Sequence, residues 1–202
     1  MSIKSIALDV MKELEKTHPA FLIESHFQCE FALALNRLST MDINLEVQLK
    51  TVNSINGHKY RVDLIASDIK TERKFAFEFK YHTTQTDINV NGITYHLKKQ
   101  GGQKERKVDI WKDISKLEGI KNAKECDEAC FILLTNDRKG LISSKARSGA
   151  IDIDAGKHEF PSGELVYTGK SIQHGIKIKG TYDFKYEPYK TGHDFEYLIV
   201  EI

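Results

Sequence analysis

The sequence has few cysteines and prolines, almost no net charge and no long apolar run. Its 202 residues include 3 cysteines and 3 prolines, and the formal charge is +1. Three cysteines do not make a disulfide framework, and Cys126 and Cys130 lack the second pair typical of a structural zinc site. With so small a net charge, the protein does not attract nucleic acid over its whole surface as a polycation would. No segment approaches the ~20 apolar residues that cross a bilayer, and the amphipathic N-terminus differs from a signal peptide. We therefore expect a cytoplasmic protein without a membrane partner.

The N-terminal part of the chain has the apolar spacing of two amphipathic helices. The first helix is predicted from about Ser2 to Lys16, and Pro19 prevents it from continuing. The second helix carries an apolar stripe formed by Ile23, Phe27, Phe31, Leu35 and Leu38. Glu24 lies at the edge of this stripe, where a carboxylate is unfavourable unless something pairs with it.

The central part of the chain changes to the alternation typical of half-buried strands. Strands are predicted over residues 45–49, 60–66, 74–81 and 129–134, with turns at Asn56-Gly57 and Asn91-Gly92. A third helix follows Gly101-Gly102, and its apolar face is formed by Val108, Trp111, Ile114 and Leu117. Past Ser143 glycines punctuate the chain, with short strands predicted over residues 164–168, 175–179 and 195–202.

This order of elements predicts an α/β (α+β mixed) fold, in which helices flank a central mixed sheet and a β-rich extension follows. The chain is 40% hydrophobic, long enough for one compact domain and short for two. We therefore expect a single domain over residues 1–202, with its core at about residues 20–137 and the C-terminal extension at about residues 148–202.

Three charged residues stand out because of the strands that carry them. Between residues 75 and 80 the phenylalanines alternate with Glu78 and Lys80, so these two side chains share the other face. Asp63 is predicted to face away from both Val62 and Leu64. If the two strands pair, two carboxylates and one ammonium meet at one point. A charged pair of this spacing is also common on a solvated face, so spacing alone leaves a structural role open.

The convergence of Asp63 and Glu78 suits a hard divalent cation. Their carboxylates, with the backbone carbonyl of Phe79, are the oxygen ligands that Mg²⁺ accepts, and Mn²⁺ is expected to substitute for it. Such an ion lowers the pKa of bound water and stabilises charge that develops on a phosphate. Lys80 can orient the attacking water or stabilise the phosphorus centre, and Glu24 can add a ligand directly or through water.

An acidic residue on one strand and Glu-x-Lys on the next resemble the signature of the PD-(D/E)xK nuclease superfamily, although Val62 replaces the usual proline. A wider resemblance, over about residues 23–137, is to a group of restriction-endonuclease-like bacterial proteins. It rests on Glu24-Ser25-His26-Phe27-Gln28, Asp63, Glu78-Phe79-Lys80-Tyr81, Gln100-Gly101-Gly102-Gln103, Trp111-Lys112-Asp113 and Leu134-Thr135-Asn136-Asp137. The resemblance implies a restriction-endonuclease-like sheet whose active-site quartet is Glu24, Asp63, Glu78 and Lys80.

The partner that this resemblance implies is nucleic acid, with DNA as the expected substrate. A basic stretch offers a surface for the phosphate backbone, formed by Lys98, Lys99, Lys104, Arg106 and Lys107. Gln100, Gln103 and His82 are further candidates for substrate contact, although a polar helix start explains the glutamines equally well. The chain has no phosphate-binding Gly-x-x-x-x-Gly-Lys-Ser/Thr loop, so ATP-driven activity would need a partner. One site makes one cut, so double-strand cleavage would favour a homodimer.

Two other functions remain open at this point. The chain could be a binding module that keeps the fold without efficient cleavage, or a regulatory or toxin-like protein whose C-terminal region binds another protein. The intact set of Asp63, Glu78 and Lys80 favours the enzyme, because unused buried charges are unfavourable. An aromatic run suits either a protein interface or core alternation, and it comprises Tyr182, Phe184, Tyr186 and Tyr189.

Overall fold

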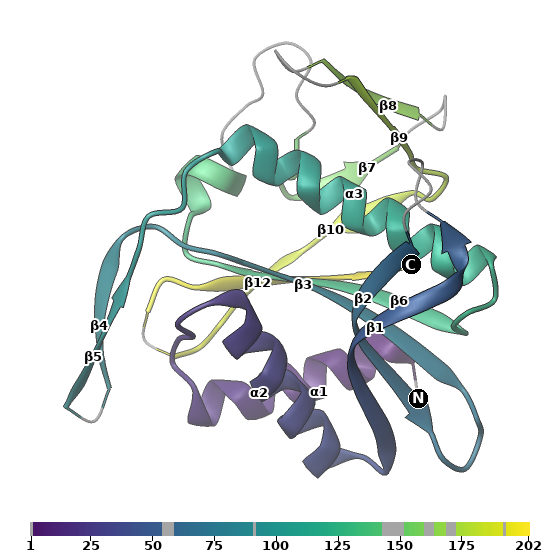
Figure 1. The fold of residues 1–202 in the computed structure, drawn as a ribbon. Helices are drawn as coiled ribbons and strands as arrows, with labels where there is room; N and C mark the ends of the chain where they lie inside the picture. The colour runs from purple at the N-terminus through teal and green to yellow at the C-terminus, as the bar shows by residue number, and fades with distance from the viewer. Residues whose placement is uncertain are drawn as a thin grey trace.

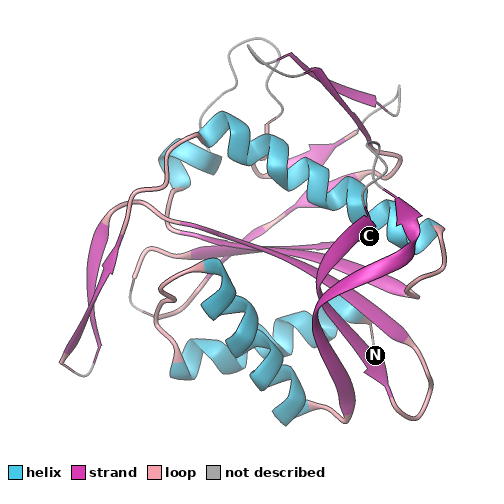
Figure 2. Cartoon of the chain, in the orientation of Figure 1, coloured by secondary structure: helices cyan, strands magenta, loops and turns pink. Residues whose placement is uncertain are grey.

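The centre of the protein is one six-stranded mixed sheet with helices on both faces (Figures 1 and 2). The structure is a computed structural model that describes residues 2–53, 59–90, 92–142, 152–159, 164–168, 173–191 and 193–202. The strand order is β1-β2-β3-β6-β12-β11, with α1 and α2 on one face and α3 on the other. This confirms the predicted class of a mixed sheet flanked by helices. The turn signals at Asn56-Gly57 and Asn91 lie outside the described residues.

Two helices, α1 (Ile3–Thr17) and α2 (Glu24–Leu38), cover the first face. The Ser2 hydroxyl caps α1 by accepting a hydrogen bond from the Ser5 amide at 3.3 Å. Phe27, Phe31 and Leu35 are fully buried, as their spacing predicts, whereas Ile23 and Leu38 at the ends of the stripe are 59% and 50% exposed. The stripe is therefore shorter than predicted. In the described ranges, no helix is long and apolar enough to cross a membrane.

The first three strands form an antiparallel meander, and the fourth joins it in parallel. They are β1 (Met41–Asn53), β2 (Lys59–Asp68), β3 (Lys74–His82) and β6 (Glu128–Thr135). A parallel pair needs a crossover, because the chain must return to the same end of the sheet. The hairpin of β4 (Thr86–Val90) and β5 (Ile93–Leu97) and the long helix α3 (Gln103–Asn122) supply it. Gly102 precedes α3 with φ +77°, a conformation that favours glycine.

The C-terminal region is built into the core rather than appended to it. β12 (Glu196–Glu201) lies between β6 and β11 (Tyr186–Pro188) in the central sheet. The remaining C-terminal elements are η1 (Arg138–Ile142, a π-helix), β7 (Gly156–His158), β8 (Glu164–Thr168), β9 (Gln173–Lys177) and β10 (Tyr182–Phe184). Trp111 of α3 is fully buried and stacks on Phe184 with ring centroids 5.1 Å apart. Part of the aromatic run therefore belongs to the core, where it covers α3.

Candidate active site

Asp63 lies where β2 separates from β3. Pairing of these strands begins at Leu64, and the alternation of β2 breaks at Asp63. Val62 packs beneath α3, whereas Leu64 packs with α1 and α2, so the prediction that the two share one face is wrong. On β1, opposite Asp63, Glu46 has a left-handed φ of 53°, which is unfavourable for a residue with a side chain. The buried Gln28 amide stabilises this irregular point by donating to the Asp63 carbonyl at 2.6 Å and the Glu46 carboxylate at 3.3 Å.

The two carboxylates anchor each other's strands. Asp63 Oδ2 accepts a hydrogen bond from the Phe79 amide at 2.8 Å, and Glu78 Oε1 accepts one from the Asp63 amide at 3.2 Å. Where the strands separate, the two carboxylates therefore accept the backbone N–H groups of Phe79 and Asp63 in place of backbone carbonyls. The arrangement fulfils the expectation that β2 and β3 bring Asp63 and Glu78 to one point. It also places both groups beneath α3, away from the phenylalanine face.

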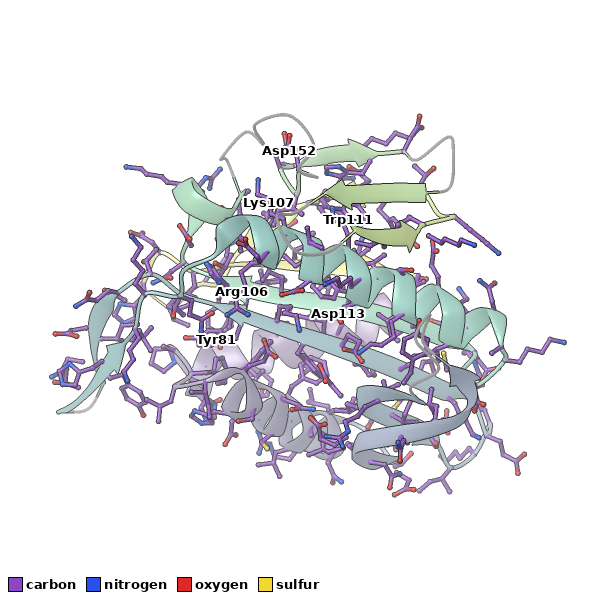
Figure 3. The ribbon with its side chains drawn as sticks, turned by 45° about the horizontal axis from the view of Figure 1, so that its top comes forward. Tyr81, Arg106, Lys107, Trp111, Asp113 and Asp152 are labelled. Carbon is purple, nitrogen blue, oxygen red and sulfur yellow. The ribbon has the colours of Figure 1, made fainter. Side chains whose placement is uncertain are left out.

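Lys80 lies on the same face of β3, between a helix from each side of the sheet. Its Nζ is 2.8 Å from Asp113 Oδ2 on α3 and 3.7 Å from Glu24 Oε1 at the start of α2. The other Glu24 oxygen accepts a hydrogen bond from the Tyr81 amide at 3.0 Å. Glu24 is thus paired, as a partly buried carboxylate requires. Figure 3 shows Asp113 between α3 and the sheet.

The helix α3 contributes two charged residues that the sequence prediction did not include. Lys116 Nζ lies 2.6 Å from Glu78 Oε2 and 3.6 Å from Asp113 Oδ1, and it donates to the Arg61 carbonyl at 3.0 Å. Asp113 belongs to the motifs that carry the family resemblance, but the resemblance implies no role for it. The available signal was the spacing of Asp113 and Lys116, three residues apart beside the buried Ile114. Such spacing becomes informative only once the helix face against the sheet is known.

Burial makes ionisation of the two strand carboxylates unfavourable. It raises the pKa of Asp63, although the Phe79 amide, Lys116 and Lys80 oppose the shift. Burial and the neighbouring Asp113 raise the pKa of Glu78 well above its ordinary value, and Lys116 only partly compensates. For Lys80, burial alone would lower the pKa, but Asp113 and Glu24 outweigh it and raise the pKa. Burial therefore disfavours the ionised form of both carboxylates and Lys116 offsets this only in part, whereas Lys80 remains an ammonium at neutral pH.

The donor set fits a hard divalent ion. The carboxylates of Asp63 and Glu78 are oxygen ligands, and a third oxygen comes from β3. The N–H and C=O of a strand residue point to the same side, so the Phe79 carbonyl faces β2 together with the Asp63 carboxylate. The Lys116 ammonium lies on the second oxygen of Glu78, where it competes with an ion for that carboxylate.

The position of Glu24 relative to this donor set bears on its predicted role as a ligand. Among the residues that the structure describes, Glu24, Asp63 and Glu78 do not form a group of three whose ligand atoms all lie within 4.8 Å of one another. Without an ion, Glu24 contacts Lys80 and the Tyr81 amide, and its role as a ligand stays a prediction. A contact with the ion through water remains compatible with this position.

A small pocket opens beside Lys80 and is lined by three of the predicted substrate contacts, His82, Gln100 and Arg106. Its polar lining is formed by Glu24, Lys80, His82, Gln100 and Arg106. The Gln100 backbone is held in place because its N–H donates to the Thr83 carbonyl at 2.9 Å. Arg106 is exposed in the first turn of α3, and Figure 3 places it on the side of Tyr81. Lys80 and Arg106 both line this pocket, which is too small to hold a phosphate.

The other predicted contacts divide into exposed and buried residues. Lys98 and Lys99 are exposed, and the side chains of Gln103 and Lys104 lie outside the described part of the structure. Lys107 is 2% exposed and its Nζ is 3.3 Å from Asp152 on the far side of α3, so it does not belong to an exposed basic surface (Figure 3).

His82 is also buried, which corrects its prediction as an open phosphate contact. It is 3% exposed, and its Nε2 lies 3.2 Å from Asp137 Oδ2. Burial lowers the pKa of His82, so the ring is neutral at physiological pH. The pair ties the end of β3 to the turn after β6.

Comparisons of the chain with protein-family models, with curated proteins and with solved structures each found no match.

Proposed function

We propose that this protein is a metal-dependent nuclease that hydrolyses phosphodiester bonds, with DNA as its substrate. The observation that carries the proposal is the mutual anchoring of Asp63 and Glu78, each accepting a backbone N–H from the other strand. This places two buried carboxylates and the ammonium of Lys80 on one face, at a point where the sheet opens. It is also the arrangement that the resemblance to PD-(D/E)xK nucleases implies.

The chain's own residues supply the positions that phosphodiester hydrolysis requires. Asp63, Glu78 and the Phe79 carbonyl would hold a Mg²⁺ ion, which when bound activates water and stabilises phosphate charge. Lys80 is held by Asp113 in a fixed position, so its ammonium can orient the attacking water or neutralise a phosphate oxygen. Asp113 is thus a positioning residue for Lys80.

Lys116 prepares the site for an ion. Its ammonium neutralises Glu78 before an ion binds, so that a buried carboxylate does not remain unpaired. A divalent ion would share or displace this contact. The Glu78 carboxylate is therefore paired in the free protein, and an ion competes with one internal cation.

The substrate backbone would approach from the side of the pocket that contains Gln100 and Arg106. Lys98 and Lys99 precede this pocket in the chain and are exposed, so they extend the same positive approach. A phosphate held by Arg106 would lie beside Lys80.

Cleavage of supercoiled plasmid with Mg²⁺ or Mn²⁺ tests the proposal. We expect activity that disappears in EDTA and falls at least ~100-fold in Asp63→Asn and Lys80→Met, consistent with the size of electrostatic contributions to catalysis. Lys112→Met, at an exposed lysine on α3, is the control and should retain activity.

A DNA-binding activity that persists in EDTA without cleavage by any metal would contradict the enzyme and favour a binding module. Cleavage of single-stranded RNA but not of DNA would correct the substrate. A homodimer would be indicated by linear product appearing without a nicked intermediate, together with the mass in solution.

A further inference from the structure

Two histidines and a glutamate gather where α1 meets α2, on the opposite face of the sheet from Lys116. His18 caps the C-terminal end of α1, and His26 and Glu30 lie one turn apart on α2. Each residue offers one ligand atom, and these atoms all lie within 4.8 Å of one another. This is the only such group of three among the residues that the structure describes. The chemistry of the proposed nuclease does not use it.

The spacing of these atoms is close to that of a tetrahedral metal site. Glu30 Oε2 lies 3.4 Å from His18 Nε2, and Oε1 lies 3.9 Å from His26 Nε2. Ligand bonds of ~2.0–2.1 Å at tetrahedral angles put neighbouring ligand atoms roughly 3.3 Å apart. The two Glu30 contacts are therefore within about 0.6 Å of this spacing, and all three ligand atoms lie within 4.8 Å of one another. All three side chains are partly exposed, at 22% to 29%, so an ion can enter from solvent.

The surroundings hold the rings in place. Fully buried Phe21 stacks on the His18 ring at 5.6 Å between centroids and meets the His26 ring edge-on at 5.5 Å. Thr17 Oγ1 is 2.9 Å from His18 Nδ1, and this hydroxyl also lies within reach of the Leu14 carbonyl. A proton on His18 Nδ1 would then donate to Thr17, which leaves the Nε2 lone pair directed toward Glu30. Burial also lowers the pKa of His18, which favours the neutral ring that binds metals.

We infer that His18, His26 and Glu30 form a second metal site, which binds Zn²⁺ or a chemically similar ion such as Co²⁺ or Ni²⁺. Two imidazoles and one carboxylate are a three-ligand set of the kind that leaves a fourth position for water. Mg²⁺ prefers a shell of oxygen atoms only, so this site and the carboxylates of Asp63 and Glu78 select different ions.

Ion binding would require His26 to change which ring nitrogen carries its proton. The Leu22 amide donates to His26 Nδ1 at 3.2 Å, so the neutral ring carries its proton on Nε2. An ion on Nε2 takes the place of that proton, Nδ1 becomes the protonated atom, and the Leu22 amide turns to water. This hydrogen bond is exposed to solvent, so water can replace His26 as the acceptor. The ion would then join the end of α1 to the start of α2, two residues from Glu24.

Titration of tag-free protein with Co²⁺ and Zn²⁺ in excess Mg²⁺ tests this inference. The Mg²⁺ competes for the carboxylate site, so the readout does not depend on nuclease activity. We expect one Co²⁺ per chain with the visible absorption of a tetrahedral ion, displacement of that ion by Zn²⁺, and a higher melting temperature with Zn²⁺. Binding should weaken at least tenfold in His18→Ala, His26→Ala and Glu30→Gln.

His96→Ala is the matched control, because exposed His96 pairs with Asp87 and belongs to no group of three metal ligands within the described ranges. Its affinity for Zn²⁺ should equal that of the wild type. Glu30→Gln keeps the shape of the side chain and preserves the test if an alanine variant does not fold. The inference is overturned if the wild type gives no saturable Co²⁺ absorption, or if Zn²⁺ binds all three variants as tightly as the wild type.

Discussion

Replacing Lys116 with methionine probes the energetics of the site most directly. Methionine keeps most of the aliphatic stem of lysine but removes the ammonium that lies 2.6 Å from Glu78. The side chains of Glu78 and Lys116 are only 2% and 16% exposed, so this is a buried ion pair. Removing one partner of such a pair typically destabilises a protein by about 3–5 kcal/mol, because the other charge stays buried without a counter-ion.

The expected loss converts to a measurable shift in melting temperature. For a chain of this length, about 1 kcal/mol corresponds to roughly 2–4 °C, so Lys116→Met should melt roughly 6–20 °C below the wild type. The deficit should shrink toward acid pH, because a protonated Glu78 needs no counter-ion. It should also shrink in saturating Mg²⁺ if the ion takes the place of the ammonium; an ion at ~100 times its Kd contributes about 2.7 kcal/mol.

Thermal unfolding followed by circular dichroism, at neutral and acid pH and with and without Mg²⁺, measures these effects. Lys112→Met is the control: its ion pair with Asp109 is about 40% exposed, and such pairs contribute at most about 1 kcal/mol. Equal melting temperatures for the two variants would refute the reasoning about the buried pair. A large deficit that Mg²⁺ leaves unchanged would instead contradict ion binding at Glu78.

The remaining predictions concern pH and two buried polar contacts. The raised pKa of Glu78 means that the folded state binds the Glu78 proton more tightly than the unfolded state does. Protonated Glu78 therefore contributes to stability below the ordinary pKa of 4.5, and this contribution is lost as the pH rises through the folded pKa. In metal-free buffer the free energy of unfolding should therefore fall with rising pH over this window. The affinity for Mn²⁺, measured by calorimetry, should rise over the same window. An affinity that does not change with pH would count against Glu78 as a ligand. Gln28→Ala leaves the Asp63 carbonyl without its donor and should lose about 1–3 kcal/mol in urea unfolding, together with cleavage; loss of neither would mean that the irregular point of β2 needs no support. Glu118→Ala removes a buried acceptor of the Lys179 and Gly180 amides and the Tyr182 hydroxyl, so it should lose at least ~2 kcal/mol and expose the segment between β9 and β10 to proteolysis. Unchanged proteolysis would show that other contacts hold that segment.

The strand that carries Glu78 and Lys80 could be predicted from the sequence because its information is local. Alternation in a strand has a period of two, so the phenylalanines of β3 determine on which face Glu78 and Lys80 lie. The same holds for the helix stripe of Phe27, Phe31 and Leu35. The prediction was wrong at both ends of the stripe, where Ile23 and Leu38 are exposed. Helix periodicity does not show where the surface that covers the helix ends.

The basic residues near the site show why exposure could not be predicted from the sequence. The stretch that contains Arg106 and Lys107 looks uniform in sequence, yet the first is exposed and the second is 2% exposed against Asp152. Neighbouring residues on a helix point about 100° apart, so one can face solvent while the next is covered. The cover comes from a segment more than forty positions later, which a local pattern does not contain.

What the sequence by itself determined was the pair of strands, their acidic residues and the lysine two positions after Glu78, because periodicity and turn residues act over a few positions. Only the tertiary structure decided that Asp113 and Lys116 complete the charge balance, that Gln28 stabilises the break in β2 at Asp63, and that Glu24 pairs with Lys80. These depend on which face of each helix lies against the sheet, and that choice is set by burial of apolar surface across the whole chain. Charges that neutralise one another are therefore close in space but far apart in sequence.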